Sequence, residues 1–153
     1  MRAVVQRVSS ASVTIGEADS AVIAGAIDQG LLVYLGVGKD DSETDAEYLA
    51  DKVAHLRIFM DDDEKMNLSL VDLGYGVLAV SQFTLYADAR KGRRPSYSDA
   101  AGNDEAFRLY EHFCRSLAAG GIHVETGRFG EIMRVAYVNE GPITILLDSR
   151  KLF

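Results

Sequence analysis

The sequence has only one cysteine, Cys114, among its 153 residues. A single cysteine excludes an internal disulfide, so the chain does not resemble the small secreted proteins that disulfides hold together, and it fits a reducing cytoplasm. Cys114 lies in a stretch with helical periodicity. This position favours a thiol that packs as a small hydrophobic side chain over a reactive nucleophile.

Long apolar runs and an excess of positive charge are also missing. No apolar run approaches the ~18–20 residues needed to span a bilayer. The opening MRAVVQRVSS is interrupted by polar residues, unlike a signal peptide. We therefore expect no membrane partner and a cytoplasmic location. The net charge is −7, from 23 acidic and 16 basic side chains. An acidic chain binds the phosphate backbone poorly, so DNA is not an expected partner and any contact with RNA must be local.

The usual signatures of metal sites and hydrolases are absent. The three histidines, His55, His112 and His123, form no H-x-x-x-H pair and have no cysteine partner for zinc. There is no G-x-S-x-G motif and no glycine-rich phosphate-binding loop. The acidic run 61–64 lacks the alternation and the glycine of a calcium loop. The sequence therefore predicts neither a metal nor a cofactor.

Hydrophobic periodicity predicts an α+β fold in a single domain, residues 1–153, with a largely antiparallel, barrel-like sheet and two main helices. One helix spans 43–56 after a capping box at Ser42, and the other begins at an Asn103 N-cap and ends at Gly120-Gly121. Continuous or alternating apolar residues predict the strands, one of them, 31–37, buried on both faces. The predicted strands are 2–8, 12–15, 21–27, 31–37, 77–83, 122–125, 132–138 and 143–147.

Two short stretches carry the functional argument. The first is Asn139-Glu140-Gly141-Pro142-Ile143-Thr144, between the last two predicted strands. A Gly-Pro step in this position predicts a tight hairpin turn. A cis peptide is accessible before Pro142, because an X-Pro bond loses only about 0.5–1 kcal/mol in the cis form.

The second stretch is Ser81-Gln82-Phe83-Thr84-Leu85, at the end of the strand 77–83. Side chains alternate along a strand, so we expect Gln82 and Thr84 to share one face. A threonine nucleophile needs a base, and none is adjacent in the sequence. The alternative is that the backbone N–H groups of this stretch stabilise an oxyanion, which contributes about 2.7–4 kcal/mol for each donor. We prefer the second scheme, although the sequence permits both.

A cluster of basic residues follows this second stretch and is the only dense one in the chain. It lies in the loop 87–98, which is either a solvated surface loop or a site of phosphate contact. Its members are Arg90, Lys91, Arg93 and Arg94.

Together, SQFTL at 81–85 and N-x-GP-x-T at 139–144 resemble the paired signatures of the D-aminoacyl-tRNA deacylase family. The resemblance runs from end to end of the chain. It also includes MRAVVQRV at the start, LRIF at 56–59, KMNLS at 65–69, KGRRPS at 91–96, GRFG at 127–130, and Met133.

The resemblance implies hydrolysis of the ester between a D-amino acid and the 3′ end of tRNA, as a proofreading step in translation. Ser81, Gln82, Phe83 and Thr84 would line the reaction centre, with Phe83 stacked on the terminal adenine. The adjoining pocket wall would consist of Phe129, Gly130 and Met133. The family usually has Ala where this chain has Glu131.

The resemblance also implies a homodimer in which the Gly-Pro turn of one subunit reaches into the site of the other. Gly141 and Pro142 would form a chiral filter, positioned by Arg7. A cis bond between them would turn both carbonyls towards the substrate Cα, where they would block an L side chain. Glycine has no side chain to block, so glycyl-tRNA should also be cleaved.

The sequence is also compatible with two other functions. A non-catalytic protein that binds RNA 3′ ends would use the same basic loop and Phe83, with Thr84 serving only the structure. A hydrolase of free small-molecule esters would be equally active without tRNA.

Overall fold

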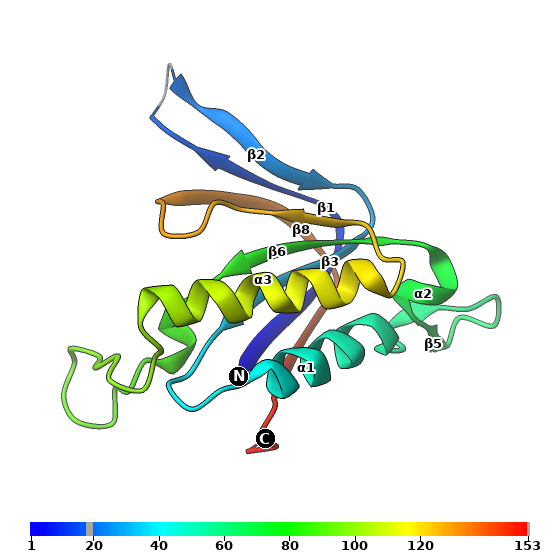
Figure 1. Ribbon diagram of the computed structural model, residues 1–153. Coiled ribbons are helices and arrows are strands. Elements are labelled where there is room, and N and C mark those ends of the chain that lie inside the picture. The colour runs from blue at the N-terminus through cyan, green and yellow to red at the C-terminus, as the bar shows by residue number, and fades with distance from the viewer. Residues whose placement is uncertain (18–19, 153) are drawn as a thin grey trace.

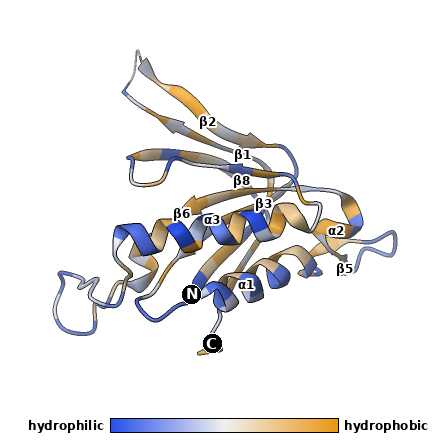
Figure 2. Ribbon diagram, in the orientation of Figure 1, coloured by the Kyte–Doolittle hydropathy of each residue, from blue (hydrophilic) through white to orange (hydrophobic). Residues whose placement is uncertain are grey.

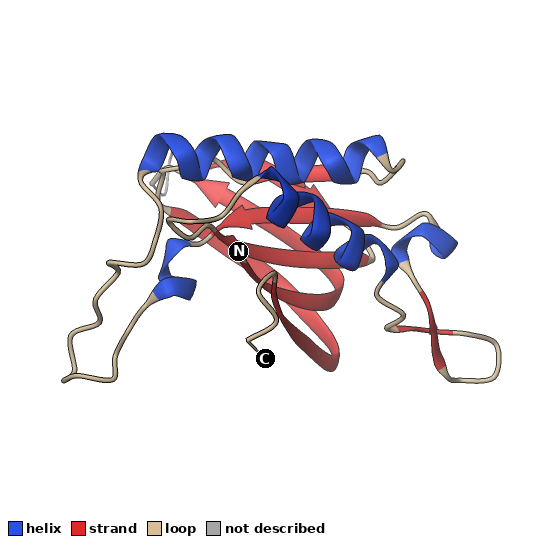
Figure 3. Ribbon diagram, turned by 60° about the horizontal axis from the view of Figure 1, so that its bottom comes forward, coloured by secondary structure: helices blue, strands red, loops and turns tan. Residues whose placement is uncertain are grey.

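A computed structural model describes residues 1–17 and 20–152. Figure 1 shows a strongly curved sheet with two long helices, α1 (Glu43–His55) and α3 (Asn103–Ala119), packed side by side across one of its faces. Figure 3 shows the same layering from another direction, with the helices above the strands. The predicted α+β fold with a barrel-like sheet and two main helices is therefore confirmed. A third helix, α2 (Leu70–Leu73), is a single short turn.

The sheet is mixed, and its strands follow the order β2-β1-β3-β6-β7, with β8 also paired to β1. Strand β1 is antiparallel to β2, β3 and β8, whereas β3, β6 and β7 run parallel to one another. A separate two-stranded ribbon joins β4 (Phe59–Met60) to β5 (Met66–Leu68). The strands of the main sheet are β1 (Arg2–Ile15), β2 (Val22–Ile27), β3 (Gly30–Gly36), β6 (Gly76–Ser81), β7 (Val124–Thr126) and β8 (Met133–Asp148).

Strand β1 bends the sheet because its two halves have different neighbours along one edge. Its residues 2–8 pair with β3, and its residues 11–15 pair with β2, while β8 runs along the other edge of both halves. The predicted strands 2–8 and 12–15 are thus one continuous strand. The bend carries β2 over towards β7, so the sheet is a nearly closed barrel.

Hydrophobic side chains fill two regions of the fold. The larger cluster lies between the sheet and the helices and includes Leu49, Phe113 and Leu31, all fully buried. The smaller cluster lies inside the curve of the sheet and includes Val13, Leu32 and Leu78. Strand β3 contributes to both clusters, which confirms the prediction that it is buried on both faces. Figure 2 shows hydrophilic and hydrophobic bands alternating along α1 and α3, as expected for helices with one buried side.

Two element boundaries differ from the sequence prediction. The N-cap of α3 is Gly102 and not Asn103, which is already the first helical residue. The strand predicted over 77–83 ends at Ser81, where a 3₁₀ turn, η2 (Phe83–Tyr86), begins. The helix predicted over 43–56 is confirmed as α1, and the side chain of Asp45 accepts a hydrogen bond from the Ser42 amide at 2.8 Å. No helix in the described ranges is long and apolar enough to cross a membrane.

We expect Gly25 to be required where the barrel nearly closes. A Cβ at this position would lie 2.4 Å from the carbonyl oxygen of Thr126 on β7, so β2 and β7 would have to separate. Crowding of this kind typically costs ~1–3 kcal/mol. The Gly25→Ala variant should therefore unfold at a lower urea concentration than the parent.

The control is Gly102→Ala. A Cβ at Gly102 meets no atom within 4 Å, and its φ of −66° suits any residue. Its cost should be only about 0.5 kcal/mol, from the poorer N-cap. Equal urea midpoints for the two variants would show that contact between β2 and β7 does not limit stability.

Candidate active site

A pocket of about 650 Å³ opens at the carboxyl end of β6. One wall is formed by Ser81, Gln82 and Phe83, at the junction of β6 and η2. The opposite wall comes from the connection between β7 and β8. It includes Phe129, Gly130 and Met133, together with Glu131. The start of α3 closes a third side. The fold thus brings together six of the residues that the sequence analysis selected, from segments almost 50 positions apart.

Aromatic rings stand at the mouth of this pocket. Phe83 is 56% exposed, and its ring meets the edge of Tyr97 at a centroid distance of 5.1 Å. Phe129 packs against Phe107 of α3, also at 5.1 Å. Exposed aromatic side chains next to a pocket are suited to stacking on unpaired bases. Tyr97 was not predicted as a pocket residue, although an aromatic residue three positions after the basic run 90–94 was a usable signal.

The chain changes direction between Ser81 and Thr84. The Gln82 amide still donates to the Leu35 carbonyl of β3 at 2.8 Å, and then η2 begins. Gln82 and Thr84 therefore do not share a strand face as predicted, because the strand has already ended. Their side chains meet all the same: Gln82 Nε2 donates to Thr84 Oγ1 at 2.5 Å.

Thr84 itself is not part of the pocket lining. Within the described residues, its hydroxyl contacts no carboxylate, imidazole or amine that could act as a base. The amide groups at the start of η2 differ in their partners. Leu85 N–H donates to Gln82 O at 3.3 Å, whereas the amides of Phe83 and Thr84 have no acceptor in the described part of the chain. These two amides remain available to an external acceptor.

The Gly141-Pro142 peptide bond is cis, which confirms the expectation from the sequence. The chain does not reverse there, however, so the predicted hairpin turn is wrong. Both halves of β8 pair with β1: Asn139 lies opposite Val8, and Thr144 lies opposite Gln6. The chain therefore advances five residues along β8 while β1 advances only two. The Gly-Pro segment is a bulge within one continuous strand.

Two side chains hold this bulge in place. Arg7 is buried, and its guanidinium donates to the carbonyl of Ile58 at 2.7 Å and to that of Glu140 at 3.3 Å. Asn139 Nδ2 donates to the carbonyls of Arg7 and Ile143, at 3.0 and 2.9 Å. Gly141 has φ +124°, a region that L side chains rarely adopt. The backbone of the bulge is therefore fixed while Gly141 and Pro142 remain exposed.

The bulge is distant from the pocket of the same chain. Arg7 lies opposite Leu31 on β3, and Leu31 lies opposite Val77 on β6. Ser81 is four residues further along β6, which corresponds to about 13 Å of strand. Neither Arg7, Gly141 nor Pro142 lines the pocket. The structure therefore separates these predicted site residues into two groups, one at the carboxyl end of β6 and the other at the bulge in β8.

The basic loop is pinned at its base by Asp88 and Ser96, whose amides and carbonyls bond to each other at 2.7 and 2.9 Å. Hydrogen bonds from the Arg90 side chain and amide lower the pKa of Asp88 to about 2, so this carboxylate offsets the charge of Arg90. Within the described residues, no acidic partner is found for the other three cations of the loop, which are exposed. They are Lys91, Arg93 and Arg94.

Among the described residues, the other titratable side chains supply neither a metal site nor a reactive thiol. In the described ranges, no three His, Cys, Asp or Glu side chains are grouped to hold a metal ion. Burial raises the pKa of the Cys114 thiol to about 11, so it is neutral at physiological pH and unsuited to nucleophilic attack. Glu131, at the pocket wall, lies 3.6 Å from Arg128 as an exposed ion pair.

Solved structures with this fold include a probable eukaryotic D-amino acid tRNA deacylase. It is 19% identical, has a TM-score of 0.80, and the match covers 95% of this chain and 97% of the other. A structure of a c-Myc DNA unwinding element binding protein is 36% identical, with a TM-score of 0.88 over 97% and 98% of the two chains. The fold is thus that of the deacylase class.

The family assignment rests on sequence. The family model described as D-Tyr-tRNA(Tyr) deacylase matches residues 4–148. A D-aminoacyl-tRNA deacylase of Koribacter versatilis is 60% identical over 153 residues, which is the full length of both chains. One from Thermotoga petrophila is 58% identical, also over both full lengths. The chain belongs to the D-aminoacyl-tRNA deacylase family.

Proposed function

We propose that this protein hydrolyses the ester bond between a D-amino acid and the 3′ end of tRNA, and so removes mischarged amino acids before translation. Family membership supplies the reaction. The observation that carries the proposal to this chain is the pocket, which collects Ser81, Gln82 and Phe83 opposite Phe129 and Met133. We further propose that the chain acts in the cytoplasm as one domain over 1–153.

The pocket suits the terminal aminoacyl-adenosine of tRNA. Its volume of about 650 Å³ is in the range of small-molecule sites, roughly 300–1,000 Å³. The exposed ring of Phe83 provides a surface on which the unpaired adenine stacks, with Phe129 and Met133 on the facing wall. The ester then lies close to the start of η2.

We propose that the backbone amides of Phe83 and Thr84 stabilise the oxyanion. Water attacks the ester carbonyl, and the tetrahedral intermediate places its negative oxygen against these donors. The carbon–oxygen bond to the ribose then breaks, and the ribose oxygen takes a proton, leaving a free D-amino acid and a free 3′ hydroxyl. The neighbouring 2′-hydroxyl of the adenosine helps to activate the water. The absence of a base beside Thr84 in the described residues supports this scheme over a threonine nucleophile.

The direct test is release of amino acid from D-tyrosyl-tRNA by the purified protein. We expect multiple turnovers with D-tyrosyl-tRNA and glycyl-tRNA, and no more than background with L-tyrosyl-tRNA. Tight binding of tRNA without turnover would instead indicate a protein that only binds RNA 3′ ends. Equal activity on a D-tyrosine ethyl ester would indicate a hydrolase of free esters.

The Thr84→Val variant separates the two chemical schemes, because it removes the hydroxyl and keeps the backbone amide. We expect a kcat within about tenfold of the parent, since each oxyanion donor is worth ~10²–10³ in rate and both are retained. Loss of a true nucleophile would cost about 10⁶. Thr44→Val, at an exposed position on α1, is the control. An acyl group trapped on Thr84 and seen by mass spectrometry would overturn the backbone scheme.

We propose that Gly141 and Pro142 form the chiral filter. A site that accepts many D-amino acids cannot grip the side chain, so it must block the direction that an L side chain would take. Backbone carbonyls can do this if they are rigid. The bonds from Arg7 to Glu140, and from Asn139 across the base of the bulge, supply that rigidity. Glycine passes such a filter.

We propose that the filter of one subunit acts in the pocket of a second copy. The separation of about 13 Å along the sheet keeps the bulge out of its own pocket. Gly141 and Pro142 are exposed in the single chain, and β8 carries further exposed apolar residues, Val138 at 56% and Leu146 at 57%. A homodimer would bury this surface and complete both sites.

Mixed dimers test this arrangement. One parent carries Gly141→Ala, whose Cβ would lie 2.8 Å from the Ile143 side chain and distort the filter. The other carries Ala106→Trp, which fills the pocket and keeps the filter. We expect the first homodimer to lose D-over-L selectivity and the second to lose activity. The co-expressed heterodimer should recover selectivity, because its one open pocket receives the intact filter.

The outcome is unambiguous if the heterodimer is purified by two different tags. A filter acting within its own chain would leave the heterodimer as unselective as the Gly141→Ala homodimer. A protein that sediments as an active monomer at micromolar concentration would also exclude the arrangement.

We propose that the basic loop contacts tRNA phosphates near the 3′ end. Lys91, Arg93 and Arg94 project from a loop whose base is fixed close to the pocket, and Tyr97 of the same loop touches Phe83. Arg90 is less available to bind phosphate, because its guanidinium already forms an ion pair with Asp88. In a chain with net charge −7, a local group of cations directs RNA to one face only. The same overall charge argues against a general affinity for DNA.

A further inference from the structure

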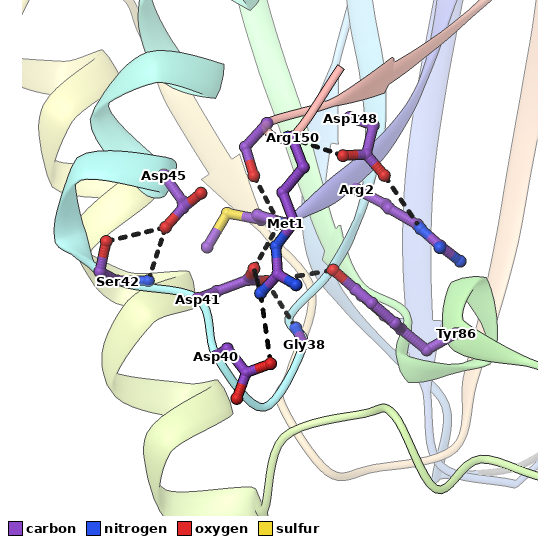
Figure 4. Close-up of polar contacts among 11 residues, drawn as sticks. Met1, Arg2, Gly38, Asp40, Asp41, Ser42, Asp45, Tyr86, Asp148 and Arg150 are labelled. Carbon is purple, nitrogen blue, oxygen red and sulfur yellow. Dashed lines mark hydrogen bonds and ion pairs between the residues drawn. The ribbon is translucent and has the colours of Figure 1, made fainter. Parts of the chain in front are cut away.

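The short turn η2 carries the reaction-centre residues, yet it is only four residues long and has no fully buried side chain. Its position must therefore come from contacts to other elements. At its start, Gln82 N–H bonds to the end of β3, as described above. At its end, Leu85 and Tyr86 are held by a different group of side chains. Figure 4 shows this group around Tyr86.

Arg2 makes two contacts with the end of η2 and one with Asp148 of β8. Its Nη1 donates to the Leu85 carbonyl at 2.9 Å, and its Nε donates to Asp148 at 3.1 Å. The guanidinium also lies over the Tyr86 ring, 4.5 Å from the ring centroid. Arg2 is itself fixed, because β1 pairs with β3 and β8 at this residue, opposite Gly36 and Asp148. A planar guanidinium can satisfy these directions at once, which an ammonium cannot.

The hydroxyl group of Tyr86 is held by Asp41. The Tyr86 hydroxyl donates to Asp41 Oδ2 at 3.1 Å, and the same oxygen accepts the Gly38 amide at 2.6 Å. The other oxygen, Oδ1, accepts the Met1 ammonium at 2.6 Å, and both side chains are fully buried. The ring fits because residue 38 is glycine, where a Cβ would lie 2.7 Å from the Tyr86 ring. Figure 4 shows these groups converging on Asp41.

The charges in this cluster keep Tyr86 as a donor. Burial, followed by the negative charge of Asp41, raises the Tyr86 pKa well above its usual value, so the hydroxyl stays protonated. Asp41 is held in this orientation, because turning away would leave the buried Met1 ammonium without its carboxylate partner and with only the neutral Ser149 hydroxyl at 2.7 Å, which would be unfavourable. The cluster is thus a rigid support that reaches η2 through two side chains, Arg2 and Tyr86.

We propose that Arg2 and Tyr86 are positioning residues for the deacylation, holding η2 so that Phe83 and the amides of Phe83 and Thr84 keep one place at the pocket wall. Neither side chain lines the pocket. Their effect on the reaction therefore passes through the backbone of η2. This inference rests on the proposed site at 81–84.

The test compares Tyr86→Phe and Arg2→Gln with two matched controls. Tyr86→Phe keeps the ring beneath Arg2 and removes only the bond to Asp41. Arg57→Gln removes an exposed arginine that also donates to a backbone carbonyl, that of Asn67 at 2.9 Å. Tyr48→Phe removes a hydroxyl on α1, away from the pocket. Steady-state deacylation of D-tyrosyl-tRNA gives kcat and KM, and amide hydrogen exchange of the peptide 82–87 reports the order of η2.

We expect Tyr86→Phe to lower kcat about tenfold, with a smaller change in KM. A tenfold change in rate corresponds to the free energy that one charge-assisted hydrogen bond typically contributes. Arg2→Gln should lower it further, and Arg2→Lys should recover only part of the loss. Exchange in 82–87 should rise in both variants, while urea midpoints and exchange elsewhere stay near those of the controls.

Two results would overturn the inference. In one, the variants keep the kcat of Arg57→Gln and Tyr48→Phe. In the other, kcat falls only in proportion to the folded fraction, and amide hydrogen exchange in 82–87 does not increase more than in the rest of the chain. If Arg2→Gln does not fold, Tyr86→Phe decides alone. A parent protein that fails to cleave D-tyrosyl-tRNA would refute the proposed function instead, and hydrogen exchange would still show whether the two side chains order η2.

Discussion

The pairing of β8 along the whole length of β1 is the interaction on which the rest of the structure depends. It joins residues near the two ends of the chain, from Arg2 opposite Asp148 to Ile15 opposite Met133. Because β1 also carries β3 on one half and β2 on the other, this pairing sets the curve of the barrel. It also places the Gly-Pro bulge beside the middle of β1, and the GRFG connection beyond Met133, which lies opposite the end of β1 at Ile15.

Much of this arrangement could be predicted from the sequence, because it follows from local patterns. The helices over 43–56 and near 103–120 have the spacing of apolar residues that burial of one face requires. The continuous apolar run at 31–37 indicated a strand between two hydrophobic layers, and β3 has that position. The cis bond before Pro142 was also expected. Each of these features depends on residues close together in the chain.

The features that escaped prediction depend on partners far away in the sequence. Asn139 to Thr144 looks like a hairpin because Gly-Pro suits a reversal, but both flanking segments find the same long partner, so the extra residues bulge out. The strand at 77 ends at Ser81 because β3, its neighbour, ends at Gly36. Tyr97 lies at the pocket because backbone hydrogen bonds between Asp88 and Ser96 close the base of its loop. No pattern of residue spacing in the sequence predicts that contact.

The mechanism that we propose relies on rigid backbone and not on reactive side chains. In this mechanism the aminoacyl ester is already activated, so positioned donors and a water molecule are enough for hydrolysis, and a strong nucleophile would endanger L-aminoacyl-tRNA as well. Selection by backbone likewise requires that the backbone not move. Each of these two segments is held by buried or partly buried hydrogen bonds to neighbouring elements. Arg7 and Asn139 make them at the bulge, and Arg2 and Tyr86 make them at η2. In both places a buried or half-buried arginine donates to backbone carbonyls, which converts a flexible loop into a fixed surface without adding a group that could react.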